Sequence, residues 1–296
     1  MNTRTLSFEV WLLKLGIWVL GFGIFLAACA APTLSPTPDN SAPTEVQVAV
    51  ATGDILPGSP RLPLVLFDGP HPITDAQSVQ VTVFDLATPS APRAGWSGPA
   101  TAYADYEIPY WVAYPQLPRA GRWGLNLQIT KADGSSTQAQ LTVQVVEKVD
   151  SPNVGDTPPA SHNRTLATEP DIAKLTSDIS PEPGLYQLTV ADALTSGKPT
   201  VVTFATPAFC TSRLCAPVVD SVKAVYADLK DSVNFIHIEV YKDFGPPPVY
   251  ADEMDEWRLQ SEPWTFVMDR AGKVVARLGG PVSPAELRSV LEPLVK

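Results

Sequence analysis

The chain has 296 residues, with 21 Lys and Arg against 31 Asp and Glu, which gives a formal net charge of −10. Because domains commonly run to roughly 100–150 residues, this length predicts two folded cores joined by tethers. The acidic balance argues against nucleic acid as a partner, since a phosphate backbone needs a basic surface. Hydrophobic residues make up 45% of the chain, which excludes a wholly disordered protein, while 31 prolines indicate much extended sequence.

The amino terminus has the pattern of an export signal. Residues 15–28 are uncharged and apolar but too few to span a bilayer, which takes about 20 residues. Arg4 and Lys14 supply the positive flank, and small residues follow. The sequence Leu26-Ala27-Ala28-Cys29 resembles the lipobox of bacterial lipoproteins, in which the cysteine is acylated and becomes the first mature residue.

The lipobox resemblance implies that residues 1–28 are a signal peptide and that Cys29 is the lipidation site, carrying acyl chains such as palmitate. The protein would then be anchored to the cell membrane on its extracytoplasmic side, within the cell envelope. The alternative is an uncleaved signal anchor in which Cys29 is only a small apolar residue. Residues 29–45 are rich in Pro, Ser and Thr and predict an extended linker.

Residues 46–149 predict an antiparallel β-sandwich of the immunoglobulin-like kind. Apolar and polar residues alternate with a period of two, turn sequences such as Ala132-Asp133-Gly134-Ser135 separate the stretches, and no helical period of useful length appears. Strands are expected at residues 46–50, 62–67, 79–84, 123–129 and 138–146. Residues 115–127 resemble the late strand of immunoglobulin-like modules on bacterial surface proteins. The aromatic residues Tyr103, Tyr106, Tyr110 and Trp111 are either a contact surface or ordinary core and edge residues. We expect this segment to be a spacer or an interaction module.

Residues 150–184 predict a second linker, and residues 185–296 then alternate strands and helices. Strands are expected at 200–205, 233–240, 264–268 and 273–278, and helices at 188–194 and 216–229. The last helix has a clear start in Ser283-Pro284-Ala285-Glu286, with an N-cap serine, a proline at the first helical position and a capping-box glutamate.

This order of elements resembles the thioredoxin fold over about 110 residues. The strand that ends at Ala205 leads to Cys210, where a thioredoxin places its nucleophilic cysteine, and Pro263 matches the family's cis-proline. The resemblance implies three catalytic residues: Cys210 as nucleophile, Cys215 as resolving thiol and Pro263 as the shaper of the substrate groove. It also implies protein thiols and disulfides outside the cytoplasm as partners, with no cofactor and no metal. Glu262 would flank the groove.

The cysteine spacing departs from the family, whose active site is Cys-x-x-Cys. Four residues separate Cys210 from Cys215. In a regular helix, residues five apart have Cα atoms about 8.6 Å from each other, beyond the roughly 7 Å limit for a disulfide. A disulfide can therefore close only if Cys210 precedes the helix or if the first turn unwinds. A helix N-terminus and the cation of Arg213 would lower the pKa of Cys210.

The pair Cys210 and Cys215 favours thiol-disulfide exchange, because two cysteines remain after Cys29 is acylated and the compartment is oxidising. Three alternatives stay open. The pair could be a structural disulfide in a non-catalytic scaffold. It also resembles the cysteine spacing of the peroxiredoxin Q class, although no activating arginine is evident. Finally, Cys210, Cys215 and His237 could bind Cu(I) as in the Sco chaperones, although a strand histidine beside Glu239 is more typical of a buried, hydrogen-bonded residue.

Overall fold

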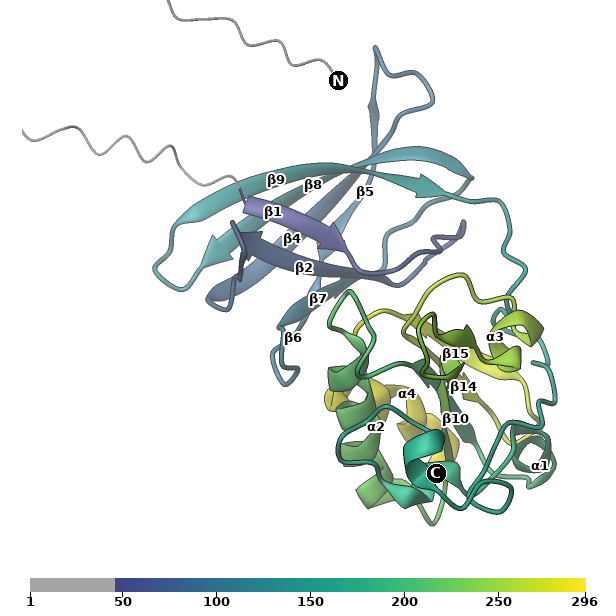
Figure 1. Cartoon of the computed structure of the whole chain (residues 1–296). Helices are drawn as coiled ribbons and strands as arrows, with labels where there is room; N and C mark the ends of the chain where they lie inside the picture. The colour runs from purple at the N-terminus through teal and green to yellow at the C-terminus, as the bar shows by residue number, and fades with distance from the viewer. Residues whose placement is uncertain (1–45) are drawn as a thin grey trace, which may run out of the picture. The chain divides into compact units, whose positions relative to one another are not determined.

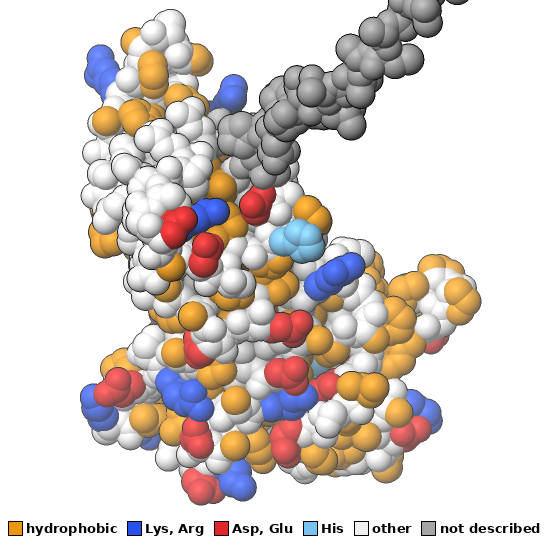
Figure 2. Space-filling model, turned by 90° about the vertical axis from the view of Figure 1, so that its left-hand side faces the viewer, with side chains coloured by type: hydrophobic (Ala, Val, Ile, Leu, Met, Phe, Trp, Pro, Cys, Tyr) orange, Lys and Arg blue, Asp and Glu red, His pale blue; other side chains and the backbone are white. Residues whose placement is uncertain are grey.

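The computed structural model describes residues 46–296 (Figure 1). The expected signal peptide, Cys29 and the linker 29–45 lie outside the described residues. None of the helices in the described part of the chain is long and apolar enough to cross a membrane. On the face shown in Figure 2, acidic and basic side chains are interspersed over the surface.

The N-terminal part consists of two antiparallel sheets that enclose one core. The first sheet has the order β1 (Val46–Val50), β2 (Leu62–Asp68), β7 (Tyr110–Ala113) and β6 (Thr101–Tyr103), with β3 (His71–Pro72) also paired to β2. The second has the order β5 (Arg93–Pro99), β4 (Ala76–Asp85), β8 (Gly121–Lys131) and β9 (Ser136–Val145). Alternate residues such as Val81 on β4 and Leu127 on β8 face Leu64 on β2 within one buried cluster. The expected antiparallel β-sandwich is confirmed.

The C-terminal part is a four-stranded sheet with helices on both faces (Figure 1). Its strand order is β11 (Asn234–Glu239), β10 (Thr200–Ala205), β14 (Trp264–Met268) and β15 (Val274–Gly279); β10 and β11 are parallel and the other pairs antiparallel. The helices are α1 (Val190–Thr195), α2 (Cys215–Leu229), α3 (Asp252–Glu256) and α4 (Pro284–Val295). A small hairpin, β12 (Tyr241–Asp243) with β13 (Val249–Tyr250), follows β11.

The pleat of the central strand divides the C-terminal core into two layers. All six residues of β10 are buried. Val201 points into the cluster with Val222 of α2 and Leu287 of α4, whereas Phe204 points to the opposite cluster with Val190 of α1. A continuous apolar strand flanked by two helical layers is what the parallel part of a sheet requires.

Residues 150–184 pack against the C-terminal sheet, although their composition predicts a linker. They contain the 3₁₀ turns η1 (Ile172–Lys174) and η2 (Pro183–Tyr186). The Asn163 Oδ1 atom accepts a hydrogen bond of 2.8 Å from the Val190 backbone N–H, and Leu175 is buried in the core cluster with α2. Small polar side chains such as Asn163 can be buried here because they find hydrogen-bond partners, a property that composition does not reveal.

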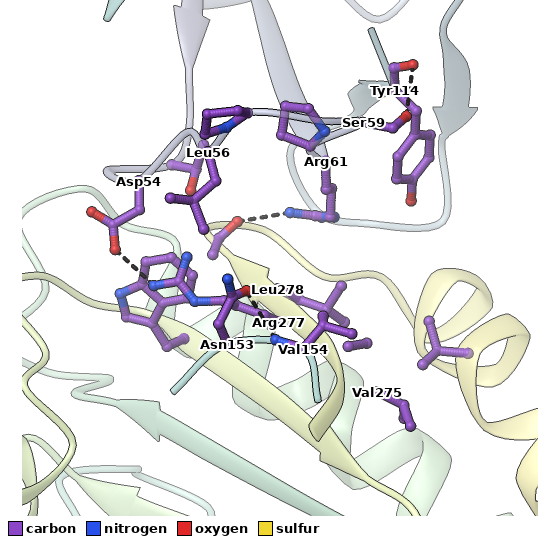
Figure 3. A pocket seen from close by; sticks show the side chains of 17 residues that line it. Asp54, Leu56, Ser59, Arg61, Tyr114, Asn153, Val154, Val275, Arg277 and Leu278 are labelled. Atoms are coloured by element: carbon purple, nitrogen blue, oxygen red, sulfur yellow. Dashed lines mark hydrogen bonds and ion pairs between the residues drawn. The ribbon is translucent and has the colours of Figure 1, made fainter. Parts of the chain in front are cut away.

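The first sheet also contacts helices α2 and α4. Val65, Tyr110 and Val112 pack with Val218 of α2 in a separate apolar cluster. A cavity at this junction is lined by residues including Asp54, Arg61, Tyr114 and Arg277 (Figure 3). Its two arginines are paired, Arg61 with Glu286 at 2.6 Å and Arg277 with Asp54 at 2.7 Å. The charged groups of this cavity therefore hold the two parts together.

Candidate active site

Cys210 lies in the loop that joins β10 to α2, and Cys215 is the first residue of the helix. The backbone N–H groups of Phe209 and Cys210 both donate to the Thr206 carbonyl, at 3.3 and 3.1 Å, which folds the loop back toward the helix start. Cys210 thus precedes the helix, and this alone satisfies the first of the two alternative conditions for a disulfide between cysteines of this spacing. Both are free thiols, Cys210 half-buried and Cys215 fully buried, and their Sγ atoms lie within 4.8 Å of each other.

The two thiols have opposite acidities. Hydrogen bonding from Cys215, and further hydrogen bonds from the Ser212 hydroxyl and from the backbone N–H groups of Cys215 and Leu214, lower the pKa of Cys210 to about 5 against the opposing effect of burial. The Ser212 Oγ atom lies 3.1 Å from the Cys210 sulfur. The hydrogen bond to Cys210 and then burial raise the pKa of Cys215. Near neutral pH the site therefore holds a thiolate at Cys210 and a protonated thiol at Cys215.

Arg213 was expected to add a cation beside Cys210. Its side chain is exposed, and the leading causes of the lowered Cys210 pKa are hydrogen bonds. Its backbone takes a φ of 62°, in the left-handed region that a non-glycine residue adopts at some cost. Arg213 therefore forms part of the turn that leads into α2.

Glu262 lies beside the thiols, in the segment before β14, and Pro263 follows it in the chain. The Glu262–Pro263 peptide bond is cis, at the position for which the sequence suggested a cis-proline, and Pro263 is buried. A Glu262 carboxylate oxygen lies within 4.8 Å of both sulfur atoms. Burial, and then the negative charge of Cys210, raise the pKa of Glu262. A carboxyl group so placed can hold or accept a proton next to the sulfur pair.

His237 does not join the cysteines, which corrects the copper alternative built on it. Its Nε2 atom lies 3.1 Å from the Ala205 carbonyl and must donate to it, so Nδ1 accepts from the Tyr186 hydroxyl at 2.7 Å. Burial lowers the pKa of His237. Both ring nitrogens are thus engaged within the core. Among the described residues, the group with metal-ligand spacing at this site is Cys210, Cys215 and Glu262.

Aromatic side chains border Cys210 on the protein surface. Phe209 stacks on Phe244 with ring centroids 5.6 Å apart and meets Tyr241 edge-on at 5.9 Å. Tyr241 in turn lies 5.0 Å from Tyr250. Phe209 is 40% exposed and Tyr250 57% exposed. These four residues, Phe209, Tyr241, Phe244 and Tyr250, form a partly exposed aromatic surface that begins at the residue next to the thiolate.

A residue of the N-terminal part also contacts the residue before Cys215. Tyr106, in the loop between β6 and β7, donates its hydroxyl to the Leu214 carbonyl at 2.9 Å. Burial, and then the charges of Cys215 and Cys210, raise its pKa, which places its hydroxyl in the electrostatic surroundings of both thiols. The sequence shows an aromatic cluster at this point but nothing that directs it toward a cysteine more than 100 positions away.

Residues 186–294 match the family model of the thioredoxin-like domain, and this part of the chain is a thioredoxin-like domain. Among solved structures, a thiol:disulfide interchange protein DsbE from Chlorobium tepidum, described as putative, is similar at 14% identity over 49% of this chain and 100% of that chain, with a TM-score of 0.36. A second thiol:disulfide interchange protein, of the thioredoxin family, from Chlorobium tepidum TLS shares 19% identity over 37% of this chain and 86% of its own, with a TM-score of 0.31.

CopC from Methylosinus trichosporium OB3b is similar at 15% identity over 35% of this chain and 93% of its own, with a TM-score of 0.25. At such identities and TM-scores these likenesses assign no activity to the chain. No curated protein matches the sequence. The function therefore has to be argued from the thiol site itself.

Proposed function

We propose that the chain is an extracytoplasmic, membrane-anchored thiol-disulfide oxidoreductase whose active pair is Cys210 and Cys215. The observation that carries the proposal is the asymmetry of the pair. The thiolate of Cys210 is half-buried and can react with a partner sulfur. The protonated thiol of Cys215 is buried, and its Sγ atom lies within 4.8 Å of the Cys210 Sγ atom. A thiolate nucleophile with a nearby resolving thiol is the minimum that two-step disulfide exchange requires.

The chemistry follows from this geometry. The Cys210 thiolate attacks one sulfur of a partner disulfide, forming a mixed disulfide and releasing the partner's second sulfur as a thiolate. Cys215 then loses its proton, for which the Glu262 carboxylate is the adjacent acceptor, and attacks the Cys210 sulfur. This forms the Cys210–Cys215 disulfide and expels the partner's remaining thiolate, so two electrons pass to the partner. A dithiol protein resets the pair by the reverse steps.

The partner would be a protein that presents its sulfur over the aromatic surface. Phe209 directly precedes Cys210 and stacks on Phe244, so the residues that flank a partner cysteine would contact these rings. Exposed aromatic rings contribute contact area to a transient interface at little conformational cost. Pro263 follows Glu262 and would shape the partner's path, as the resemblance to thioredoxins implies.

In this proposal residues 1–28 are a signal peptide, Cys29 carries the lipid, and residues 29–45 are the tether. The β-sandwich spans residues 46–149 and the redox domain residues 185–296, with residues 150–184 as a packed connection. Two or three acyl chains would anchor the protein stably, since one chain alone binds a membrane only marginally. Support comes from the Leu26-Ala27-Ala28-Cys29 sequence.

The scaffold alternative, with a permanent structural disulfide, predicts no role for an acidic thiol. The lowered pKa of Cys210 and its partial exposure favour exchange instead. The peroxidase alternative would need a cation to activate Cys210, whereas hydrogen bonds are the leading causes of its acidity.

The test is turnover of a protein disulfide by the full chain and by two variants, Cys210→Ser and Cys215→Ser. We expect Cys210→Ser to abolish turnover and Cys215→Ser to accumulate a mixed disulfide with the partner, visible by mass spectrometry. Thermal unfolding of each variant checks that the fold is intact. Full turnover by Cys210→Ser would end the proposal, and oxidation of Cys210 by peroxide far faster than a free thiol would favour the peroxidase.

A further inference from the structure

The loop between β6 and β7 contacts the start of the helix that carries Cys215. Its Tyr106 is 4% exposed and packs with Leu214 and Val218 in one apolar cluster. The Tyr106 ring packs edge-on against the ring of Tyr110 on β7, with ring centroids 5.3 Å apart, so the N-terminal sheet supports its position. The hydroxyl donates to the Leu214 carbonyl at 2.9 Å. The loop thus contacts the helix through a partly buried hydrogen bond in addition to apolar packing.

The Leu214 carbonyl belongs to the same peptide group as the Cys215 backbone N–H. Hydrogen bonding by this N–H is among the causes that lower the pKa of Cys210, and the Cys210 and Cys215 sulfur atoms lie within 4.8 Å of each other. Because a peptide group is planar and rigid, fixing its oxygen also fixes the direction of its N–H. A second donor, the Val218 N–H at 3.1 Å, is the ordinary helical partner of this carbonyl. Tyr106 adds a bond that the helix alone does not provide.

We propose that Tyr106 is a positioning residue of the thiol site, holding the Leu214–Cys215 peptide so that its N–H stabilises the Cys210 thiolate. Hydrogen bonds in series polarise one another, so a donor on the carbonyl also strengthens the N–H as a donor to sulfur. The β-sandwich would then complete the redox site rather than serve as a spacer. This inference rests on the proposed function for its role in exchange, but the effect of Tyr106 on the Cys210 thiolate can be measured without any exchange.

The groups that face Cys210 come from three directions. Cys215 and Ser212 donate to it from the helix start and the loop, Glu262 adds a carboxyl group from the segment before β14, and Tyr106 lies on the side of the β-sandwich. Glu239 acts on Glu262 from β11. Burial raises the pKa of Tyr106, so its hydroxyl stays protonated and remains a donor wherever the thiolate forms.

The test uses the reduced full chain, with the rate of Cys210 alkylation by iodoacetamide followed by mass spectrometry across pH. Tyr106→Phe keeps the buried ring and removes only the donor. We expect the midpoint of its profile to move upward by about half a pH unit, because a thiolate hydrogen bond is weakened by a fraction of its strength. A midpoint equal to that of the parent chain would overturn the proposal.

Two variants serve as matched controls. Tyr103→Phe removes a hydroxyl at the last residue of β6, where the Tyr103 ring stacks on Tyr110. Tyr110→Phe removes a buried hydroxyl that donates to the Glu286 carboxylate and accepts from the Ser283 N–H. It should lower the stability of the fold, and this hydroxyl makes no hydrogen bond to the thiol site. Both should keep the parent midpoint, and an equal shift in Tyr110→Phe would show that general loosening, not positioning, moves the profile.

Alkylation needs no partner and no turnover, so the two proposals can fail separately. A chain that shows no exchange but whose Tyr106→Phe profile is shifted would lose the proposed function and keep the positioning role. A chain that exchanges normally with an unshifted Tyr106→Phe profile would lose the positioning role alone.

Discussion

Arg61 and Glu286 form a buried, two-pronged ion pair between the first sheet and the last helix. The Arg61 Nε atom lies 2.6 Å from Glu286 Oε1, and its Nη2 atom 2.7 Å from Oε2. Arg61 also donates to the Gly279 carbonyl at 2.7 Å. The side chains are 7% and 1% exposed. Because both charges are removed from water and paired in a bidentate geometry, neither can lose its partner without a large penalty.

Replacing Arg61 by methionine should therefore lower the free energy of unfolding by about 3–5 kcal/mol, since a buried carboxylate is left unpaired. Urea denaturation of the full chain measures this loss. Arg288→Met is the control on α4, the helix that carries Glu286. Arg288 pairs with Asp228 in an exposed position, so this substitution should lower the free energy of unfolding by no more than about 1 kcal/mol. Equal losses in the two variants would contradict a special role for Arg61. The double variant Arg61→Met with Glu286→Leu should recover much of the stability.

The pH profile of Cys210 alkylation should have its midpoint near 5, the value to which the hydrogen bonds lower its pKa. Since the pKa is lower in the folded protein than the usual value of about 8.5, ionisation of Cys210 stabilises the reduced fold. This contribution is complete above pH 8.5 and is lost as the pH falls through 5. A midpoint near 8.5 would contradict the arrangement.

Cys215→Ala should shift that midpoint upward. The reason is that hydrogen bonding from Cys215 is the leading cause of the lowered Cys210 pKa. Iodoacetamide kinetics of the alanine variant measure the shift. If Cys215→Ala kept the parent midpoint, the thiol–thiolate hydrogen bond would not be the source of the acidity.

Tyr186→Phe should cost about 1–3 kcal/mol of stability and leave Cys210 alkylation unchanged. The substitution leaves the buried Nδ1 atom of His237 without its donor. Denaturation and alkylation are measured on the same preparation. A change in the alkylation profile would mean that His237 acts on the thiols, contrary to its engagement with Tyr186 and Ala205.

Phe244→Ala should raise the KM for a protein disulfide about three- to tenfold and leave the rate with a small disulfide unchanged, since an aromatic contact contributes about 0.5–1.5 kcal/mol. Val275→Ala is a control at an exposed apolar residue elsewhere, on β15. Equal effects of Phe244→Ala on both substrates would argue that the aromatic surface acts on the thiol site and not on the partner.

The regular elements could be predicted from the sequence where the local pattern alone determines them. The strands expected at 200–205 and 264–268 are β10 and β14, and the expected helix at 216–229 is α2, which begins one residue earlier. Ser283 caps α4 as expected, accepting from the Glu286 N–H at 3.1 Å. The sequence does not indicate strands β5 to β7, because β5 contains two glycines and the four residues of β7 are buried without alternation.

The contacts between distant segments could not be predicted. A capping box has the glutamate return to the N-cap N–H. Here the Glu286 carboxylate pairs with Arg61 instead, and the Ser283 N–H donates to the Tyr110 hydroxyl at 2.8 Å. Likewise, the sequence placed Cys210, Cys215 and Pro263 in one site, but nothing local connects Tyr106 to Leu214. Such pairings depend on how whole sheets pack, which no periodicity encodes.

The reduction potential of the Cys210–Cys215 pair tests the proposed function most directly. It is measured on the full chain by alkylation after equilibration in graded thiol buffers. An exchange protein with a stabilised thiolate should give a value above about −270 mV, because a low nucleophile pKa favours the reduced form. A value below about −300 mV would mark a permanent structural disulfide and contradict the account.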